Sequence, residues 1–257
     1  MVAEANEPIA LADIAPTLNL PKATVHRLAA LLKHLGFLQH EPGTKRFIVG
    51  PKLTIIALDA LINSSLRGER HAILRAPVDE VGETCNMTVP DSDTVVYVDR
   101  VEFHWPLRTH FQPGSRVPLH CGASGKLFLS LMPARKRRQL LTAAPLKRYT
   151  ERTVVDSDKI NEELKRIRAK QVGLDVEEFL PDLIGLAVPV FDSQNHLWAT
   201  VSMRAPTARL NVGQVLAVCR RSGTRLVPSP ARSIRGPTAR AVRSPLCPKP
   251  PHGLRVS

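Results

Sequence analysis

Residues 122–126, Gly-Ala-Ser-Gly-Lys, are of the types that surround phosphate in nucleotide-binding loops. In the motif G-x-x-x-x-G-K-[ST], backbone N–H groups surround the phosphates, and the final hydroxyl binds Mg²⁺. That motif needs glycine at position 120 and serine or threonine at position 127, where this chain has His120 and Leu127. The sequence also has no G-x-S-x-G nucleophile motif. The stretch therefore does not predict phosphoryl transfer or hydrolysis.

Other reactive side chains have spacings that disfavour catalysis and metal binding. His120 and Cys121 are adjacent, so on a strand they point to opposite faces and cannot form a nucleophile and base pair. The carboxylates around Asp175 alternate faces in the same way, which favours an ordinary solvated strand face. We expect no metal, no cofactor and no enzymatic activity, with an enzyme as the alternative class. The residues without metal-ligand spacing are Cys85, Cys121, Cys219, Cys247, His71, His104, His110 and His120.

A predicted helix from residue 22 to residue 35 has one polar and one apolar side. Its polar side contains Lys22, Ala23, His26, Arg27, Ala30 and Lys33, and its apolar side contains Val25, Leu28, Leu32 and Leu35. Residues 11–18 show the spacing of a shorter helix before it. Asn19 tolerates the left-handed conformation of a tight turn, Pro21 suits a first helical turn, and Gly36 favours a helix end.

Two short strands are predicted directly after this helix pair, at residues 37–40 and 46–49. Residues 41–44, Glu-Pro-Gly-Thr, favour a turn between them, and Lys45 and Arg46 lie beside its tip. Helix, turn, helix and hairpin in this order indicate a winged helix-turn-helix, whose second helix enters a major groove while the hairpin contacts phosphates or a minor groove. The alternative is a small helical domain with ordinary solvated charges.

The remaining chain predicts an α+β domain. Helices at Pro51–Asn63 and residues 69–84 lead to strand signals at residues 85–90, 94–100, 107–111 and 116–119. Helices follow at residues 123–131, 133–141 and 156–170, the last capped by Asp156. Strand signals then return at residues 175–179, 185–191 and 197–204. Strands at both ends with helices between them are typical of a sensor sheet covered by helices.

Composition limits the class of protein further. The 257 residues suffice for two domains, and no apolar run reaches 18 residues. The N-terminus lacks signal-peptide features, so we expect a cytoplasmic protein without a membrane segment. Residues 193–257, with ten Arg, one Lys and no acidic residue, carry +11 of the formal net charge of +13. DNA binding is therefore predicted from the local helix pattern and not from total charge.

Several separate motifs resemble the IclR-type regulators. Residues 11–38, LADIAPTLNLPKATVHRLAALLKHLGFL, are similar to the DNA-binding helices of that family. VVYVDRVE, PLHCGASGK, GLDVEEF, AVPVFD and SMRAPTARL resemble successive landmarks of its effector domain, with matching order over residues 9–210. The resemblance implies a winged helix-turn-helix, a dimerising linker helix and a GAF-like α+β effector domain. It also implies homodimers or homotetramers on double-stranded operator DNA, controlled by a small organic or aromatic acid.

The resemblance also implies which residues bind each ligand. The operator-facing residues would be Lys22, Ala23, Thr24, His26 and Arg27, with Lys45 and Arg46 from the hairpin. The effector-binding residues would be Ala123, Ser124, Asp175, Gly185, Ser202 and Arg204. Backbone N–H groups at a helix start favour a carboxylate, and an arginine can hold it with two hydrogen bonds. Asp175 would suit a hydroxyl or amide of the ligand better. Some relatives have cysteine in place of Gly185 and serine in place of Arg204, and a surface ion pair is the alternative for Arg204.

The implied domains are residues 1–50 for DNA binding, 51–68 for the linker helix and 69–210 for the effector domain. Only seven residues precede Pro8, so the family's first helix looks truncated. Residues 211–257 lack the expected final amphipathic helix and are rich in Arg and Pro, which is typical of a disordered tail or of a shifted reading frame. We therefore predict a regulator of bacterial metabolic genes. The alternative is a truncated paralogue that only dimerises or binds ligand.

Overall fold

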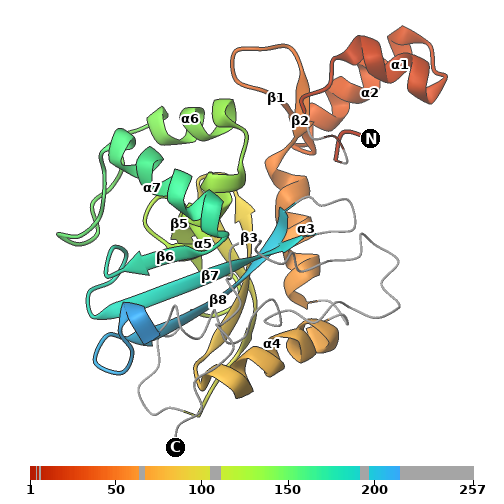
Figure 1. Cartoon of the computed structure of the whole chain (residues 1–257). Helices are drawn as coiled ribbons and strands as arrows, with labels where there is room; N and C mark the ends of the chain where they lie inside the picture. The colour runs from red at the N-terminus through yellow and green to blue at the C-terminus, as the bar shows by residue number, and fades with distance from the viewer. Residues whose placement is uncertain (4, 6, 64–66, 105–110, 192–196, 215–257) are drawn as a thin grey trace, which may run out of the picture. The chain divides into compact units, whose positions relative to one another are not determined.

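The computed structural model describes residues 1–214 apart from residues 4, 6, 64–66, 105–110 and 192–196 (Figure 1). The chain forms two compact units, Met1–Ser64 and Ser65–Ser257. The division places α3, Pro51–Asn63, in the first unit. The strand predicted at residues 107–111 lies mostly outside the described residues, as does nearly all of the tail. The limits predicted for the linker and effector segments stay predictions.

The first unit is the winged helix-turn-helix that the sequence predicts. Helices α1, Leu11–Leu18, and α2, Lys22–His34, are joined by a turn in which Asn19 has a left-handed φ of 52°. The N–H of Asn19 donates to carbonyl oxygens at the end of α1, which satisfies part of the helix end. Strands β1, Leu38–His40, and β2, Phe47–Val49, then form an antiparallel hairpin.

Close backbone contacts hold the hairpin against the end of α2. Gly36 ends the helix with a φ of +78°, and Gly50 N–H donates to Phe37 O at 2.8 Å. A Cβ atom on Gly50 would lie 2.3 Å from Gly36 O, so only glycine permits this approach. The two glycines therefore set where the hairpin stands relative to α2.

The apolar side predicted for α2 is only partly buried within the first unit. Val25 and Ala29 are buried, and Val25 packs with Ile14 and Ala15 of α1. Leu28, Leu32 and Leu35, by contrast, are 39–44% exposed. The eight-residue α1 covers only the line of α2 through Val25 and Ala29, so the neighbouring line of leucines stays uncovered within this unit.

The second unit is built on one six-stranded sheet in the order β5-β4-β3-β8-β7-β6, with every pairing antiparallel. The strands are β3, Cys85–Asp91, β4, Thr94–Val101, β5, Arg116–Pro118, β6, Gly173–Val176, β7, Leu183–Phe191, and β8, Leu197–Pro206. Pairing of β3 with β8 brings the first and last strands of the unit together. This is the predicted α+β, GAF-like arrangement.

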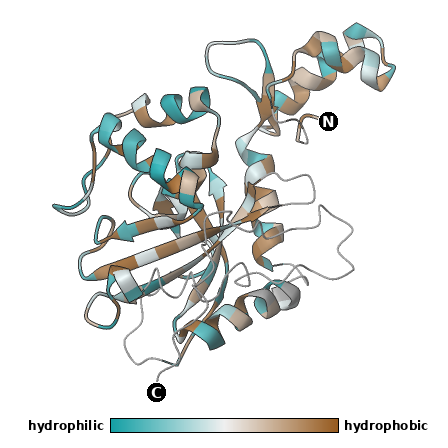
Figure 2. Ribbon diagram, in the orientation of Figure 1, coloured by the Kyte–Doolittle hydropathy of each residue, from teal (hydrophilic) through white to brown (hydrophobic). Residues whose placement is uncertain are grey.

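Four helices complete the described part of this unit: α4, Arg67–Val81, α5, Ala123–Leu131, α6, Ala134–Thr142, and α7, Ser157–Lys170. The main core joins α5 and α7 to the sheet through Val95, Tyr97, Leu127, Ile160 and Leu164. Figure 2 shows that β7 and β8 are mainly hydrophobic, whereas α7 carries many hydrophilic residues. Asp156 caps α7 as predicted, because its carboxylate accepts from the N–H groups of Asp158 and Lys159 at 2.9 Å each.

Candidate functional site

Three glycines bring the start of α5 onto the sheet. A Cβ on Gly125 would lie 2.4 Å from Leu119 O, and one on Gly173 would lie 2.1 Å from Ala123 O. A Cβ on Gly122, the residue that caps α5, would lie 2.8 Å from Val117 Cγ1. No side chain larger than hydrogen fits these approaches without displacing backbone or neighbours. The first residues of α5 are thereby held against β5 and β6.

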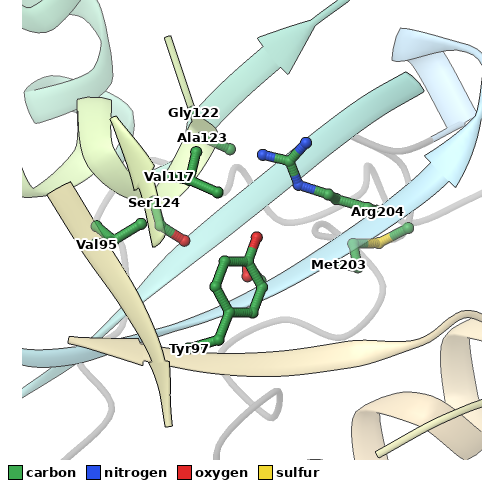
Figure 3. A pocket seen from close by; sticks show the side chains of 9 residues that line it. Val95, Tyr97, Val117, Gly122, Ala123, Ser124, Met203 and Arg204 are labelled. Carbon is green, nitrogen blue, oxygen red and sulfur yellow. The ribbon is translucent and has the colours of Figure 1, made fainter. Parts of the chain in front are cut away.

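A small pocket lies beside this helix start (Figure 3). It contains about 210 Å³ of empty space, part of it open to solvent. Figure 3 shows the Ser124 hydroxyl and the Arg204 guanidinium turned toward the same space from α5 and β8. The lining residues are Val95, Tyr97, Val117, Gly122, Ala123, Ser124, Ser202, Met203 and Arg204.

Arg204 places a buried positive charge in this pocket. Its guanidinium carbon lies 5.0 Å from the ring centroid of Phe111 and 5.5 Å from that of Phe179, and Nη2 lies 3.2 Å from Asp175 Oδ2. Burial acts to lower the pKa of Arg204, but Tyr97 and Asp175 outweigh it and raise that pKa. Nη1 and the Ser202 hydroxyl are buried without a hydrogen-bond partner among the described residues. Each leaves a hydrogen-bonding atom for a ligand.

Asp175 and Gly185 lie beside the pocket and do not line it. The Asp175 carboxylate pairs with Arg204 and accepts from the N–H of Glu178 at 2.9 Å. Burial raises the pKa of Asp175 against the opposing effect of Arg204. A Cβ on Gly185 would lie 3.4–3.6 Å from Asp175, Ala123 and Arg204, which is ordinary van der Waals contact. In this structure Asp175 orients Arg204.

Ser124 is connected to two buried threonines. Its Oγ accepts a hydrogen bond from Thr200 Oγ1 at 2.9 Å, and Thr200 Oγ1 lies 2.7 Å from Thr88 Oγ1. Thr88 is on β3 and Thr200 is opposite it on β8. Both threonines have 0% exposure. The three hydroxyls form a row that ends at the pocket wall.

Lys126, one turn into α5, joins an acidic cluster instead of a phosphate. Its side chain is 1% exposed, and Nζ contacts Glu178 Oε1 and lies 2.6 Å from Glu163 Oε1. Burial acts to lower the pKa of Lys126, but the two carboxylates outweigh it and raise that pKa. Burial also raises the pKa of Glu178 to about 7, although Lys126 opposes this. The cluster ties α5 to α7 and to the turn after β6.

Sequence reasoning missed the pocket residues on β4 and β5, namely Val95, Tyr97 and Val117. It also missed Thr88, Thr200 and the cluster around Lys126. The β-rich run at residues 94–100 indicated a strand but not which face would meet a ligand. The lysine in an otherwise apolar helix was the available signal for a buried charge pair. Of the six predicted effector-binding residues, the structure brings Ala123, Ser124, Ser202 and Arg204 into the pocket wall.

The predicted operator-binding residues lie on the surface of the first unit. Lys22, Ala23, His26 and Arg27 are exposed on the first two turns of α2, and Thr24 is half-buried. Lys45 is exposed beside the hairpin turn. The exposed Arg46 donates from Nη1 to Pro8 O at 3.1 Å, which holds its side chain toward the N-terminal segment.

A winged helix-turn-helix joined to an α+β domain that has a small pocket lined by a buried arginine and serine hydroxyls is the architecture of a ligand-responsive transcription factor. The profile described as "IclR helix-turn-helix domain" matches residues 1–42, and "Bacterial transcriptional regulator IclR C-terminal" matches residues 59–221. The chain belongs to the IclR family of bacterial transcriptional regulators. It therefore combines a helix-turn-helix with an effector-binding domain, and the proteins it resembles are regulators and not enzymes.

Similar proteins span most of the chain. The probable transcriptional regulator SauR of Cupriavidus necator is 37% identical over 216 residues, which cover 84% of this chain and 86% of that protein. The crystal structure of Thermotoga maritima IclR is 24% identical with a TM-score of 0.58, covering 84% of this chain and 87% of that one. The inducer-binding domain of PobR from Acinetobacter is 25% identical with a TM-score of 0.57, covering 63% of this chain and 98% of that one.

The described residues contain no group of three or more His, Cys, Asp or Glu side chains arranged to hold a metal ion. Within the same residues, no helix combines the length and apolar character needed to cross a membrane.

Proposed function

We propose that this chain binds operator DNA through α2 and the β1-β2 hairpin, and that a small organic acid bound between α5 and β8 changes that binding. In this proposal the regulated genes are metabolic genes of a bacterium. The observation that carries the effector assignment is the buried Arg204, which lines the pocket and whose Nη1 has no hydrogen-bond partner among the described residues. A carboxylate would accept from Nη1 and from the start of α5.

The size of the pocket favours a compact acid. Its empty space amounts to about 210 Å³ and includes open solvent, so the pocket would enclose only a small ligand. A double mutant of the PobR inducer-binding domain was solved in complex with 3-hydroxybenzoic acid, which supports an aromatic acid as one candidate class. A short aliphatic acid or a single-ring acid is therefore the class that we propose for this pocket.

Substitution of Arg204 by lysine tests the effector site. Lysine keeps the positive charge near Asp175 but loses the planar fork that binds a carboxylate with two hydrogen bonds. We expect Arg204→Lys to weaken binding of acetate and benzoate about ten-fold or more in calorimetric titrations. The matched control is Arg116→Lys, which alters an arginine outside the pocket that pairs with Asp91. Equal affinities in wild type and Arg204→Lys would contradict the assignment.

Removal of the Arg27 side chain tests the DNA-binding surface. If Arg27 contacts a base edge, Arg27→Ala should weaken binding to the DNA upstream of the gene by about 1–3 kcal/mol and spare a scrambled duplex. The control is Lys33→Ala, about 9 Å further along the same helix axis. Fluorescence anisotropy over a salt series measures both duplexes. Equal loss on both would assign Arg27 to phosphate, and no wild-type preference would favour the truncated paralogue that binds no DNA.

A further inference from the structure

The row of hydroxyls behind Ser124 has a fixed direction. Thr88 and Thr200 are register partners on β3 and β8, and their Oγ1 atoms are 2.7 Å apart. Thr200 Oγ1 donates to Ser124 Oγ at 2.9 Å. A hydroxyl has one proton to donate, and Thr200 donates its proton to Ser124. The short contact between the threonines must therefore use the proton of Thr88.

This order leaves the Ser124 proton free for the pocket. Ser124 accepts from Thr200, and no hydrogen bond donated by Ser124 occurs among the described residues. Its hydroxyl faces the same space as the guanidinium of Arg204 (Figure 3). Arg204 can only donate, so α5 and β8 both present donors to that space. Hydrogen bonds in a chain also polarise one another, which strengthens the last donor.

We propose that Thr88 and Thr200 are specificity-determining positioning residues, which hold Ser124 as a donor so that the pocket selects ligand oxygens that accept hydrogen bonds. Neither threonine lines the pocket; both act through Ser124. The inference rests on the effector site proposed above, and it extends that proposal to the ligands that the site would bind weakly. A carboxylate offers only acceptors, whereas the amide of the same shape has an NH₂ group that must face a donor. The bond from Thr200 occupies one of the two lone pairs of Ser124 Oγ and fixes the rotation of this hydroxyl. Without Thr200, the hydroxyl can rotate and both lone pairs can turn toward that NH₂ group.

Proton positions test the relay without any ligand. A neutron crystal structure of the full chain exchanged into D₂O would show the deuterium on each hydroxyl. We expect the deuterium of Thr200 to point to Ser124 and that of Thr88 to point to Thr200. A Thr200 deuterium directed at Thr88 would overturn the proposal.

Affinities for acetate and acetamide test the consequence, because the two probes have the same shape but different hydrogen-bonding groups. We expect wild type to prefer acetate, and Thr200→Val to reduce the acetate-to-acetamide affinity ratio roughly ten-fold, the scale of one hydrogen bond to a charged group. Thr200→Ser keeps the hydroxyl and should retain the wild-type ratio. Thr88→Val leaves the bond from Thr200 to Ser124 in place and should have a smaller effect than Thr200→Val.

The outcomes separate the relay from the proposed function. An unchanged ratio in Thr200→Val, or an equal fall in Thr200→Ser, would overturn the relay, because the effect would then not follow the hydroxyl. Thermal unfolding of each variant checks that the protein is folded before titration. If wild type binds neither probe nor benzoate, the acid effector proposed above is wrong, while the neutron positions decide the order of the hydroxyls independently.

Discussion

Glu178 shows how a single buried carboxyl makes stability depend on pH. Its side chain is 9% exposed, and burial raises its pKa from 4.5 to about 7. The folded state thus holds this proton more tightly than the unfolded state does. The stabilisation is complete below about pH 4.5 and is lost as the pH rises to about 7. Over this interval the group lowers the free energy of unfolding by up to about 1.4 kcal/mol per pH unit.

Glu178→Gln should remove this contribution. We expect the free energy of unfolding of the variant, relative to wild type, to increase between pH 5 and pH 7, because glutamine does not ionise. Urea unfolding followed by circular dichroism at both pH values measures the difference. The control is Glu162→Gln on the exposed face of α7, where the carboxylate is 72% exposed. Parallel pH dependences for wild type and Glu178→Gln would show that another group is responsible.

At the scale of elements, the position of α5 depends on backbone approaches that only glycine allows. A Cβ at Gly125 would meet Leu119 atoms at 2.4–2.7 Å, all of them backbone. The helix cannot move away from Leu119 without moving Ala123 and Ser124, which line the pocket. The geometry of the effector site is therefore tied to the packing of one helix turn.

Gly125→Ala should destabilise the second unit by about 1–3 kcal/mol or more, as overpacking a core does. Gly68→Ala in α4 is the matched control, because a Cβ there has no atom within 4 Å. Alanine favours a helix over glycine, so Gly68→Ala should leave stability unchanged or raise it by up to about 1 kcal/mol. Chemical unfolding of both variants measures the contrast. A stable Gly125→Ala protein would mean that the Leu119 backbone shifts easily.

At the scale of the whole molecule, we infer that the chain acts as a homodimer or homotetramer. On helix α3, Ile55 is 55% exposed and Ile56 is 47% exposed. These two large apolar side chains are available to pack against another chain. In the proposed regulator, paired α2 helices would read two half-sites about one DNA turn apart. Effector binding would then alter operator affinity by favouring one arrangement of the paired chains.

The double substitution Ile55→Glu with Ile56→Glu should dissociate this assembly, because each new carboxylate would be buried at an apolar interface. Sedimentation velocity of the full chain should show a dimer or tetramer for wild type and a smaller species for the variant. Tyr149→Glu, at another exposed apolar position, serves as the control. A monomeric wild type, or an unchanged assembly in the variant, would contradict the inference.

The sequence by itself determined the local elements. Asn19 and Gly36 have the left-handed φ values that their residue types favour, and Asp156 caps α7 through its own carboxylate. These features depend on residues within one or two turns, so they can be predicted from short segments. Sequence motifs also indicated the family. The leucines on the apolar side of α2 stay exposed within the first unit, because a periodic pattern does not reveal how far a short neighbouring helix reaches.

Only the tertiary structure decided the chemistry of the pocket. Thr88 and Thr200 are 112 residues apart in the chain, and they meet because β3 pairs with β8. Arg204 reaches Asp175 because β8 and β6 lie on either side of β7, where both residues pair with Gly185. Each contact depends on strand order and on register. A register shift of one residue moves every side chain of a strand to the other face of the sheet. Residue types alone therefore indicate a charge or a hydroxyl, but packing determines which of them remains free to bind a ligand.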